Sequence, residues 1–266
     1  MPGFRLSPTA ATPTLPVIDL DSGQSKTVGR GRQADVMVDD ASLSRLHARL
    51  TVDQNVLYRW VKTSSVEPFY QRLAAAGLAA PDAGTLGDVV SCPGAESCRL
   101  AVTQSRGLGR TLTEFLSTRS DLVDMVPSGH IKISGCPNGC GQHHIGSIGF
   151  QGSVRKVGSR AVPQYFVLVG GGATDEGVAH FGKVVSKVPV HRLTDALDRL
   201  LGLYKAKREG DEELGSFFRR IPPAMATEVL KDLAQLLPNE TTDQDFVDLG
   251  ETQAFAPEVM DGECSA

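Results

Sequence analysis

Short runs of alternating apolar and polar residues characterise the chain before residue 60. Val36 and Val38 alternate with polar neighbours, and Leu50 and Val56 lie in similar runs further along. A period of two is typical of strands with one buried face. We therefore expect several short strands in this part of the chain.

Helical spacing replaces this alternation from Ser65 onward. Between Ser65 and Gly77 apolar residues recur at i, i+3, i+4 and i+7, and the two end residues are of types that cap helices. The segments TDALDRLLGLYKAKR and PPAMATEVLKDLAQLLP have similar spacing, with Thr194 as the expected cap of the first. These patterns predict three helices.

Two short apolar runs, TLGDVVS and HIKIS, are predicted to be buried strands, and each leads into a loop with two cysteines. The first loop holds Cys92 and Cys98 in SCPGAESC, and the second holds Cys136 and Cys140 in GCPNGC. A helix is predicted to start at the first loop, in AESCRLAVTQSRGLGRTLTEFL. The segments IGSIGFQGSVRKV and PQYFVLVGGG are predicted strands.

The C-terminal part of the chain differs in charge from the rest. From Asn239 onward it has eight acidic residues and no basic ones. Such a segment is expected to be a solvated, loosely packed extension. The fifth cysteine, Cys264, lies in it and is not expected to take part in the site.

The composition excludes several classes of partner. With a formal net charge of −4, neither nucleic acid nor an anionic membrane is expected to bind. No run approaches the roughly 20 apolar residues of a membrane helix, and MPGFRLSPTAATPTLPV lacks the apolar centre of a signal peptide. The expected location is therefore the cytoplasm. There, paired cysteines are more often metal ligands or redox groups than disulfides.

The spacing of the four cysteines leaves two kinds of metal site open. Four thiolates can hold either a zinc ion or an iron–sulfur cluster. Zinc ligands in one loop are usually separated by about two to four residues, whereas the first pair here is separated by five and the second by three. A helix that starts at the first loop also directs N–H groups toward a negatively charged group. The spacing favours a cluster over zinc.

The two cysteine loops together resemble the paired cluster motif of the sirohaem nitrite/sulfite reductases, especially the ferredoxin-linked assimilatory type. The matching segments are SCPGAESCRLAVTQSRGL and KISGCPNGCGQHHIGSIGFQG, and the resemblance extends over about residues 50–266. It implies a [4Fe-4S] cluster held by Cys92, Cys98, Cys136 and Cys140. It also implies sirohaem, with Cys140 as the axial ligand of its iron.

The same resemblance implies an enzyme that reduces nitrite to ammonia or sulfite to sulfide with six electrons. The electron donor would be ferredoxin or a flavoprotein. Further contacts to the cofactors are implied for Gln54, Asn55, Asn138 and Gly139. No catalytic side chain is assigned, because the anion-binding basic residues of the family belong to a first half that has no match here. A second reductase half or a homodimer is therefore a further expected partner.

The segment TVGRGRQADVMVDDASLSRLHARL resembles the front of a forkhead-associated (FHA) domain, which binds phosphothreonine. The resemblance implies that Arg30 and Ser44 contact phosphate and that His47 braces the loop. The later strands of an FHA domain have no counterpart. The alternative function is accordingly an FHA-type phosphothreonine-binding or scaffold protein in which the cluster site is vestigial.

The predicted fold class is α+β, with a mixed sheet and flanking helices in the reductase-like part and a small β-rich fragment before it. The divisions that we expect are a disordered leader (residues 1–15), an FHA-like fragment (16–49), a ferredoxin-like half-domain remnant (50–80), the domain that binds sirohaem and the cluster (84–220), and a C-terminal helix with an acidic tail (221–266).

Overall fold

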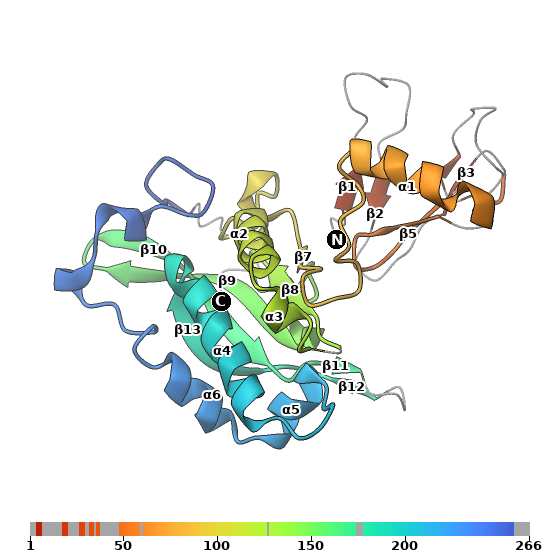
Figure 1. Ribbon diagram of the computed structural model, residues 1–266. Helices are drawn as coiled ribbons and strands as arrows, with labels where there is room; N and C mark the ends of the chain where they lie inside the picture. Colours follow the sequence, from red (N-terminus) through yellow and green to blue (C-terminus); the bar gives the residue numbers. More distant parts are fainter. Residues whose placement is uncertain are drawn as a thin grey trace. The chain divides into compact units, whose positions relative to one another are not determined.

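The chain forms two compact units, residues 1–83 and 84–266. The structure, a computed structural model, describes residues 4–6, 18–20, 27–29, 32–34, 36–37, 48–58, 61–126, 128–173 and 178–257 (Figure 1). Each unit has its own sheet, so the two are described separately.

The first unit is built from very short strands. A hairpin pairs β1 (Phe4–Leu6) with β2 (Ile18–Leu20), and a four-stranded sheet has the order β4-β3-β5-β6. The strands of that sheet are β3 (Thr27–Gly29), β4 (Val36–Met37), β5 (Ala48–Leu50) and β6 (Val56–Tyr58). Since β6 pairs with β5 and β5 with β3, the sheet continues across the division expected between residues 49 and 50.

In the part of this unit that the structure describes, one α-helix follows the sheet. Helix α1 (Val66–Ala75) comes after the one-turn 3-10 helix η1 (Thr63–Ser65) and buries none of its residues. The predicted cap residues flank it, with Ser65 at the N-cap and Gly77 at φ 71°. The helix is therefore confirmed, and among the described residues of the first unit one apolar side chain, that of Leu50, is buried.

The second unit contains a five-stranded mixed sheet of order β13-β10-β9-β8-β7 (Figure 1). Its strands are β7 (Val90–Ser91), β8 (Ile131–Ser134), β9 (Ile148–Val157), β10 (Arg160–Val169) and β13 (Lys183–Pro189). Strands β7, β8 and β9 run parallel to one another, and β10 pairs antiparallel with both β9 and β13. The α+β class is thus confirmed, as are the strands predicted before both cysteine loops.

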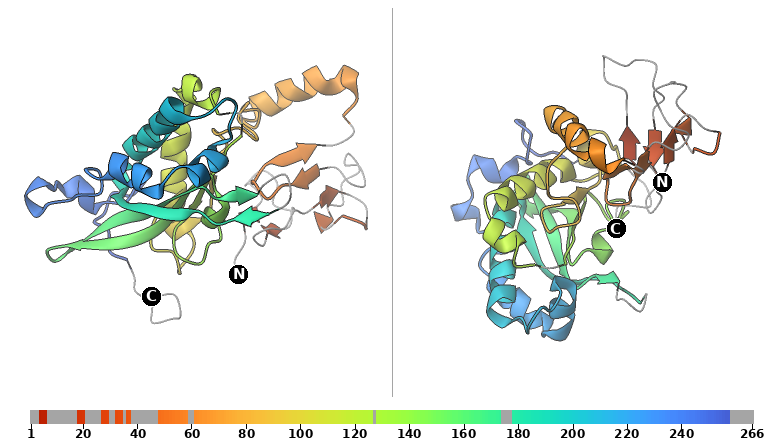
Figure 2. Two further views of the ribbon diagram at one scale, coloured as in Figure 1. Left: turned by 90° about the horizontal axis from the view of Figure 1, so that it is seen from below. Right: turned by 45° about the vertical axis from the view of Figure 1, so that its right-hand side comes forward.

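Helices cover one face of this sheet, as the left view of Figure 2 shows for α2 and α4. The helices are α2 (Ser105–Ser117), α3 (Ser120–Val123), α4 (Leu193–Lys207), α5 (Leu214–Arg220) and α6 (Pro223–Leu230). A minor hairpin pairs β11 (Gly172–Ala173) with β12 (Ala179–His180), and the one-turn helices are η2 (Gly94–Glu96), η3 (His143–Ile145), η4 (Val190–Arg192), η5 (Pro238–Glu240) and η6 (Asp243–Phe246).

The core of the second unit lies between this helical layer and the sheet. Leu108, Leu112 and Leu116 on α2 are fully buried, and they belong to one apolar cluster with Ile133 on β8 and Phe150 on β9. Their spacing on α2 is the one expected of a helix with a single buried face. This packing fixes the start of α2 against the strands that lead into the cysteine loops.

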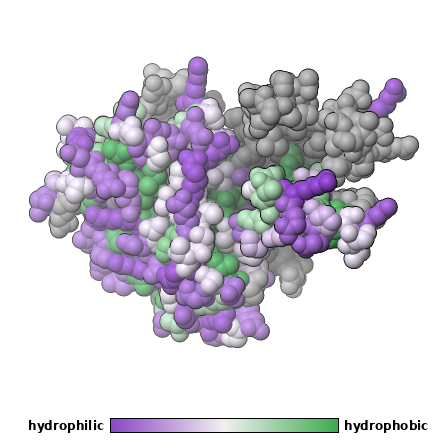
Figure 3. All heavy atoms as spheres, turned by 45° about the horizontal axis from the view of Figure 1, so that its top comes forward, coloured by the Kyte–Doolittle hydropathy of each residue, from purple (hydrophilic) through white to green (hydrophobic). Residues whose placement is uncertain are grey.

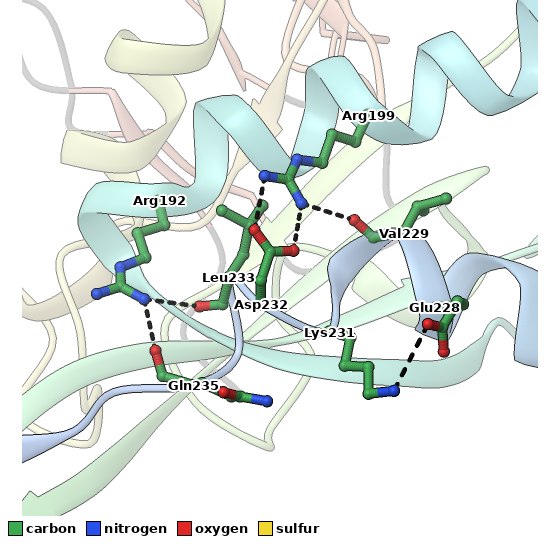
Figure 4. A network of polar contacts seen from close by, with 8 residues as sticks. All are labelled: Arg192, Arg199, Glu228, Val229, Lys231, Asp232, Leu233 and Gln235. Atoms are coloured by element: carbon green, nitrogen blue, oxygen red, sulfur yellow. Dashed lines mark hydrogen bonds and ion pairs between the residues drawn. The ribbon is translucent and has the colours of Figure 1, made fainter.

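Two arginines tie α4 to the chain that follows α6 (Figure 4). Arg199 donates to the carbonyl of Val229 (3.0 Å) and pairs with Asp232 (2.9 Å), while Arg192 donates to the carbonyl of Gln235 (2.5 Å). The predicted last helix ends at Leu230, one residue after the carbonyl that Arg199 binds.

Figure 3 shows one face of the molecule coloured by hydropathy. On the face in Figure 3, hydrophilic residues predominate and hydrophobic ones form small scattered groups. Among the residues that the structure describes, no helix combines the length and the apolar composition that crossing a membrane requires.

Three local predictions are wrong, each for a physical reason. Helix α2 begins at Ser105 and not at the first loop, because the amides of Val102 and Thr103 bind the second loop instead. Thr194 lies inside α4, whose N-cap is Arg192, because the 3-10 turn η4 leads directly into the helix. The described part of the acidic segment, residues 239–257, is not a loose extension, since Phe246 and Asp248 are buried in the second unit.

Candidate functional site

The two cysteine loops leave neighbouring parallel strands at the same edge of the sheet. Strand β7 pairs with β8, with Ser91 opposite Ile133. Cys92 follows β7 directly, and its amide donates to the carbonyl of Ile133 (3.0 Å). Because parallel strands end at one edge, Cys136, two residues beyond β8, starts from the same place. The topology therefore brings together two pairs of cysteines that are far apart in the sequence.

Backbone hydrogen bonds join the two loops into one frame. The carbonyl of Gly135 accepts from the amides of Val102 (2.9 Å) and Thr103 (3.1 Å). In the other direction, the amide of Gly135 donates to the Sγ of Cys92 (3.2 Å). An N–H group on a thiolate sulfur stabilises its negative charge. The first loop and the second loop are thus held in a fixed relation before any metal binds.

Two glycines make this close approach possible. A Cβ on Gly141 would lie 1.8 Å from the carbonyl oxygen of Ile133, so no side chain fits there. Gly94 has φ 63°, and a Cβ on it would lie 2.5 Å from the amide nitrogen of Ser105. Gly141 lets the second loop lie against β8. Gly94 lets the first loop lie against the start of α2.

The four thiols are partly shielded from water and interact electrostatically. Cys92 and Cys136 are buried, Cys98 and Cys140 are half-buried, and all four are free of disulfide bonds. Burial raises the pKa of Cys136 to about 11, with smaller contributions from the other three cysteines, while the amide of Asn138 acts to lower it. Burial also raises the pKa of Cys140, together with repulsion from Cys92 and Cys98. The thiolates therefore repel one another, and a bound cation would relieve that repulsion.

The donor set fits an iron–sulfur cluster better than one zinc ion. Within the described part of the chain, no three His, Cys, Asp or Glu side chains are arranged to hold a single metal ion. Zinc requires every thiolate sulfur at about 2.3 Å from the same ion, whereas a [4Fe-4S] cube binds each thiolate at a different iron. Four thiols that are not arranged around a single ion match the second requirement.

A pair of histidines covers the second loop. The rings of His143 and His144 are tilted by 46° to each other with centroids 3.8 Å apart, and His143 is fully buried. Burial lowers the pKa of His143 to about 4, with His144 adding repulsion, so the ring is neutral near pH 7; its Nε2 lies 3.1 Å from the Oε1 of Gln151. His144 lies over Gly139, where a Cβ would be 3.3 Å from its Nε2. The histidines brace the loop from outside.

Several predicted site residues belong to the first unit or fall outside the described part of the chain. Gln54 and Asn55 occupy the tight turn between β5 and β6 in the first unit, where the amide of Asn55 donates to the Oγ1 of Thr51 (3.1 Å) and Gln54 has φ 66°. Their role at a cofactor stays a prediction. The FHA-like residues fall outside the described part of the chain, as does Cys264; they are Arg30, Ser44 and His47.

Sequence reasoning missed the residues that support the first loop. The hydroxyl of Ser105 donates to the carbonyl of Cys92 (2.8 Å) and also lies 3.1 Å from its Sγ. A cavity of about 530 Å³ borders this loop and is lined by residues 95–99, 101, 102 and 104 and by the C-terminal residues 248, 251 and 253–257. The sequence offered one signal for these C-terminal residues, their acidic character, and it predicted that they would be exposed to solvent.

Comparisons with known proteins identify families and relatives to which the chain is similar. Residues 83–229 match the family model of the nitrite and sulphite reductase 4Fe-4S domain, and residues 26–67 match the FHA domain. The chain is 27% identical over 195 residues to a chloroplastic ferredoxin–nitrite reductase of Oryza sativa subsp. japonica, and 30% identical over 197 residues to that of Arabidopsis thaliana. Each alignment covers 70% of this chain.

Further matches extend the comparison to sulfite reductases and to a solved structure. A sulfite reductase [ferredoxin] of Mycolicibacterium paratuberculosis is 28% identical over 178 residues, which are 65% of this chain and 32% of that protein. The structure of the NirA protein of Mycobacterium tuberculosis has the same fold over 68% of this chain and 33% of that one, with a TM-score of 0.60 and 23% identity. The chain spans about a third of the length of the curated relatives it matches, which is 32% for the rice enzyme and 33% for the Arabidopsis one.

Proposed function

Because the chain belongs to the nitrite and sulphite reductase 4Fe-4S domain family, we propose that its two cysteine loops jointly bind one [4Fe-4S] cluster. The ligands would be Cys92, Cys98, Cys136 and Cys140. The observation that carries the proposal is the hydrogen-bonded frame between the loops, in which Gly135 binds both Cys92 and the chain before α2. Such a frame holds the ligands in place and lowers the ordering cost of binding.

The remaining roles follow from the family and from the loop geometry. When bound, the cluster and sirohaem supply the electron transfer and the substrate-binding iron for six-electron reduction of nitrite or sulfite. Cys140 would hold both cofactors, as a ligand of the cluster and as a ligand of the sirohaem iron. Gly139 has φ 71° and presents backbone instead of a side chain, so Asn138 and Gly139 are proposed to lie against the flat ring.

The activity is proposed for this chain together with a further reductase half, supplied by a second chain or a second copy. The reason is electrostatic, since reduction of an anion needs fixed positive charge above the open face of the iron. The relatives include enzymes named for ferredoxin and for NADPH as donors. A ferredoxin or a flavoprotein is accordingly the proposed electron donor.

Anaerobic reconstitution of the full-length chain with iron and sulfide tests the cluster. We expect about four iron and four sulfide per chain. The matched control is Cys264→Ser, which removes a thiol outside both loops and should leave the content unchanged. One zinc ion per chain without sulfide would contradict the proposal.

A second candidate function is phosphothreonine recognition by the first unit, which the match of residues 26–67 to the FHA domain favours. Titration of the full-length chain with a phosphothreonine peptide and its unphosphorylated form separates the candidates. The reductase interpretation predicts weak binding or none, because α1 buries no residue and the sheet strands are two or three residues long. Micromolar affinity that is lost in Arg30→Ala would favour the FHA function.

A further inference from the structure

The C-terminal segment from Asp243 to Pro257 packs back onto the second unit. Phe246 is buried in a small apolar cluster with Val162 and Leu236, and the guanidinium group of Arg160 lies 3.6 Å from the centre of its ring. Phe246 thus fixes the path of the residues that follow it.

Those residues bring a buried carboxylate to the start of α2. Asp248 is 3% exposed, and its Oδ2 accepts from the amide of Gln104 (2.8 Å). Its Oδ1 accepts from the amide of Leu249 (2.8 Å). Gln104 is the N-cap of α2 and makes no side-chain cap, and the first turn of the helix has no acidic residue. The negative charge that stabilises a helix N-terminus comes here from a residue 144 positions away.

The same end of α2 supports the first cysteine loop. Ser105, next to Gln104, contacts both the carbonyl and the sulfur of Cys92. The C-terminal segment is seated closely on the helix, since a Cβ on Gly107 would lie 2.2 Å from the carbonyl oxygen of Leu249. Asp248 therefore lies two short contacts away from a proposed cluster ligand.

A second connection runs through the cavity of about 530 Å³. Cys98 and Asp248 both line it, as does Glu251, whose Oε1 accepts from the side-chain amide of Gln104 (2.6 Å). The C-terminal segment thus forms one wall of the opening that leads to Cys98. Solvent access and net charge near the sulfur ligands are two factors that set the potential of an iron–sulfur cluster.

We propose that Asp248 is a positioning residue that fixes the start of α2 behind the first cysteine loop and, by its charge, lowers the reduction potential of the bound cluster. The proposal rests on the cluster proposed above. A fixed carboxylate in a poorly solvated place opposes the addition of an electron nearby, and it offsets the positive end of α2, which favours that electron. Loss of the carboxylate therefore makes the cluster easier to reduce.

The charge state of Asp248 is consistent with this role. Burial raises the pKa of the carboxyl, and the amides of Gln104 and Leu249 act against that rise. Both oxygens accept hydrogen bonds from N–H groups, an arrangement that a neutral carboxylic acid satisfies less well.

A redox titration of the reconstituted full-length chain, followed by electron paramagnetic resonance, tests the proposal without any turnover assay. In Asp248→Asn the midpoint potential should move to a more positive value than in the wild type. Asp248→Glu keeps the charge and should return the potential toward the wild-type value. The control is Asp243→Asn, which removes the same charge from an exposed residue of the C-terminal segment that pairs with Arg160. This variant should leave the midpoint potential unchanged.

The outcomes separate this inference from the proposed function. A wild-type chain that binds no cluster refutes the proposed function and the inference with it. A loaded chain whose potential is the same in Asp248→Asn, or shifts equally in Asp243→Asn, refutes the inference alone. If the Asp248→Asn variant binds no cluster, the midpoint potential of Glu251→Gln tests the proposal instead. Glu251 is exposed and lines the same cavity. A smaller positive shift supports the proposal, and no shift overturns it.

Discussion

The two cysteine loops are supported in different ways. Apart from its hydrogen bonds to the first loop through Gly135, the second loop relies on residues close to it in sequence: the amide of Gly141 donates to the Oγ of Ser134 (3.1 Å), and His144 covers Gly139. The first loop relies on distant ones, because the helix start behind it is capped by Asp248. Local support is encoded within a motif, whereas long-range support requires the whole unit to fold. The second loop should therefore be formed earlier and the first loop should be the more sensitive to remote changes.

The largest expected effect is loss of the cluster on removal of a ligand from either loop. Cys98→Ser and Cys136→Ser should each reduce iron and sulfide content to near zero, because a cube with three thiolates is poorly held. The visible absorbance of the cluster and analysis of bound iron and sulfide measure this loss. Retention of a full cluster in one of the two variants would show that the loops do not share it.

A side chain placed between the second loop and β8 should have the next largest effect, a loss of folding stability. In Gly141→Ala the new Cβ would clash with the backbone of Ile133, so we expect a loss of about 3 kcal/mol or more in the free energy of unfolding. Gly202→Ala is the matched control, since nothing lies within 4 Å of its Cβ position in α4. That variant should gain up to about 1 kcal/mol. Chemical denaturation of the metal-free chain measures both.

The histidine bracing of the second loop predicts a dependence on pH. The folded-state pKa of His143 is lowered to about 4, below the ordinary 6.5 of the unfolded chain. The unfolded chain therefore binds the proton first, and stability that is present above about pH 6.5 is lost as the pH falls toward about 4. The expected loss is about 2–3 kcal/mol. In His143→Gln the pH dependence should flatten in this window, and an unchanged slope would contradict the assignment.

The smallest effect is expected for contacts on the exposed rim of the first loop. Gln104→Ala removes the side-chain bond to Glu251 but keeps the backbone amide that Asp248 binds. Exposed polar contacts of this kind contribute about 0–1 kcal/mol. By contrast, Asp248→Ala leaves buried N–H groups without acceptors and should cost about 1–3 kcal/mol. Similar losses in the two variants would mean that the helix cap is not what supports the first loop.

The sequence could predict what depends on short-range patterns. The strands that precede both loops, the order of the cysteines and the helix with Ser65 at its N-cap follow from periodicity and cap residues, and the structure has all of them. The resemblance to the reductases also pointed to the family that the comparisons show.

Features that depend on contacts between distant segments could not be predicted. The true start of α2 depends on Gly135, more than thirty residues later, which binds the amides of Val102 and Thr103. Asp248 has the residue type of a solvated tail, and its buried position depends on Phe246 and on a helix that begins far earlier. No local sequence pattern indicates such a long-range contact. The charge of Asp248 therefore predicted exposure to solvent, whereas the structure has it buried at the start of α2.

X-ray absorption at the iron edge tests the central claim, that the two loops share one cluster, most directly. The sample is the anaerobically reconstituted full-length chain, with Cys264→Ser as the control for iron bound outside the loops. The account predicts sulfur neighbours and, in addition, a shell of iron neighbours that is lost in Cys98→Ser and in Cys136→Ser alike. Iron with sulfur neighbours but no iron neighbours, or an iron shell that survives loss of either ligand, would contradict it.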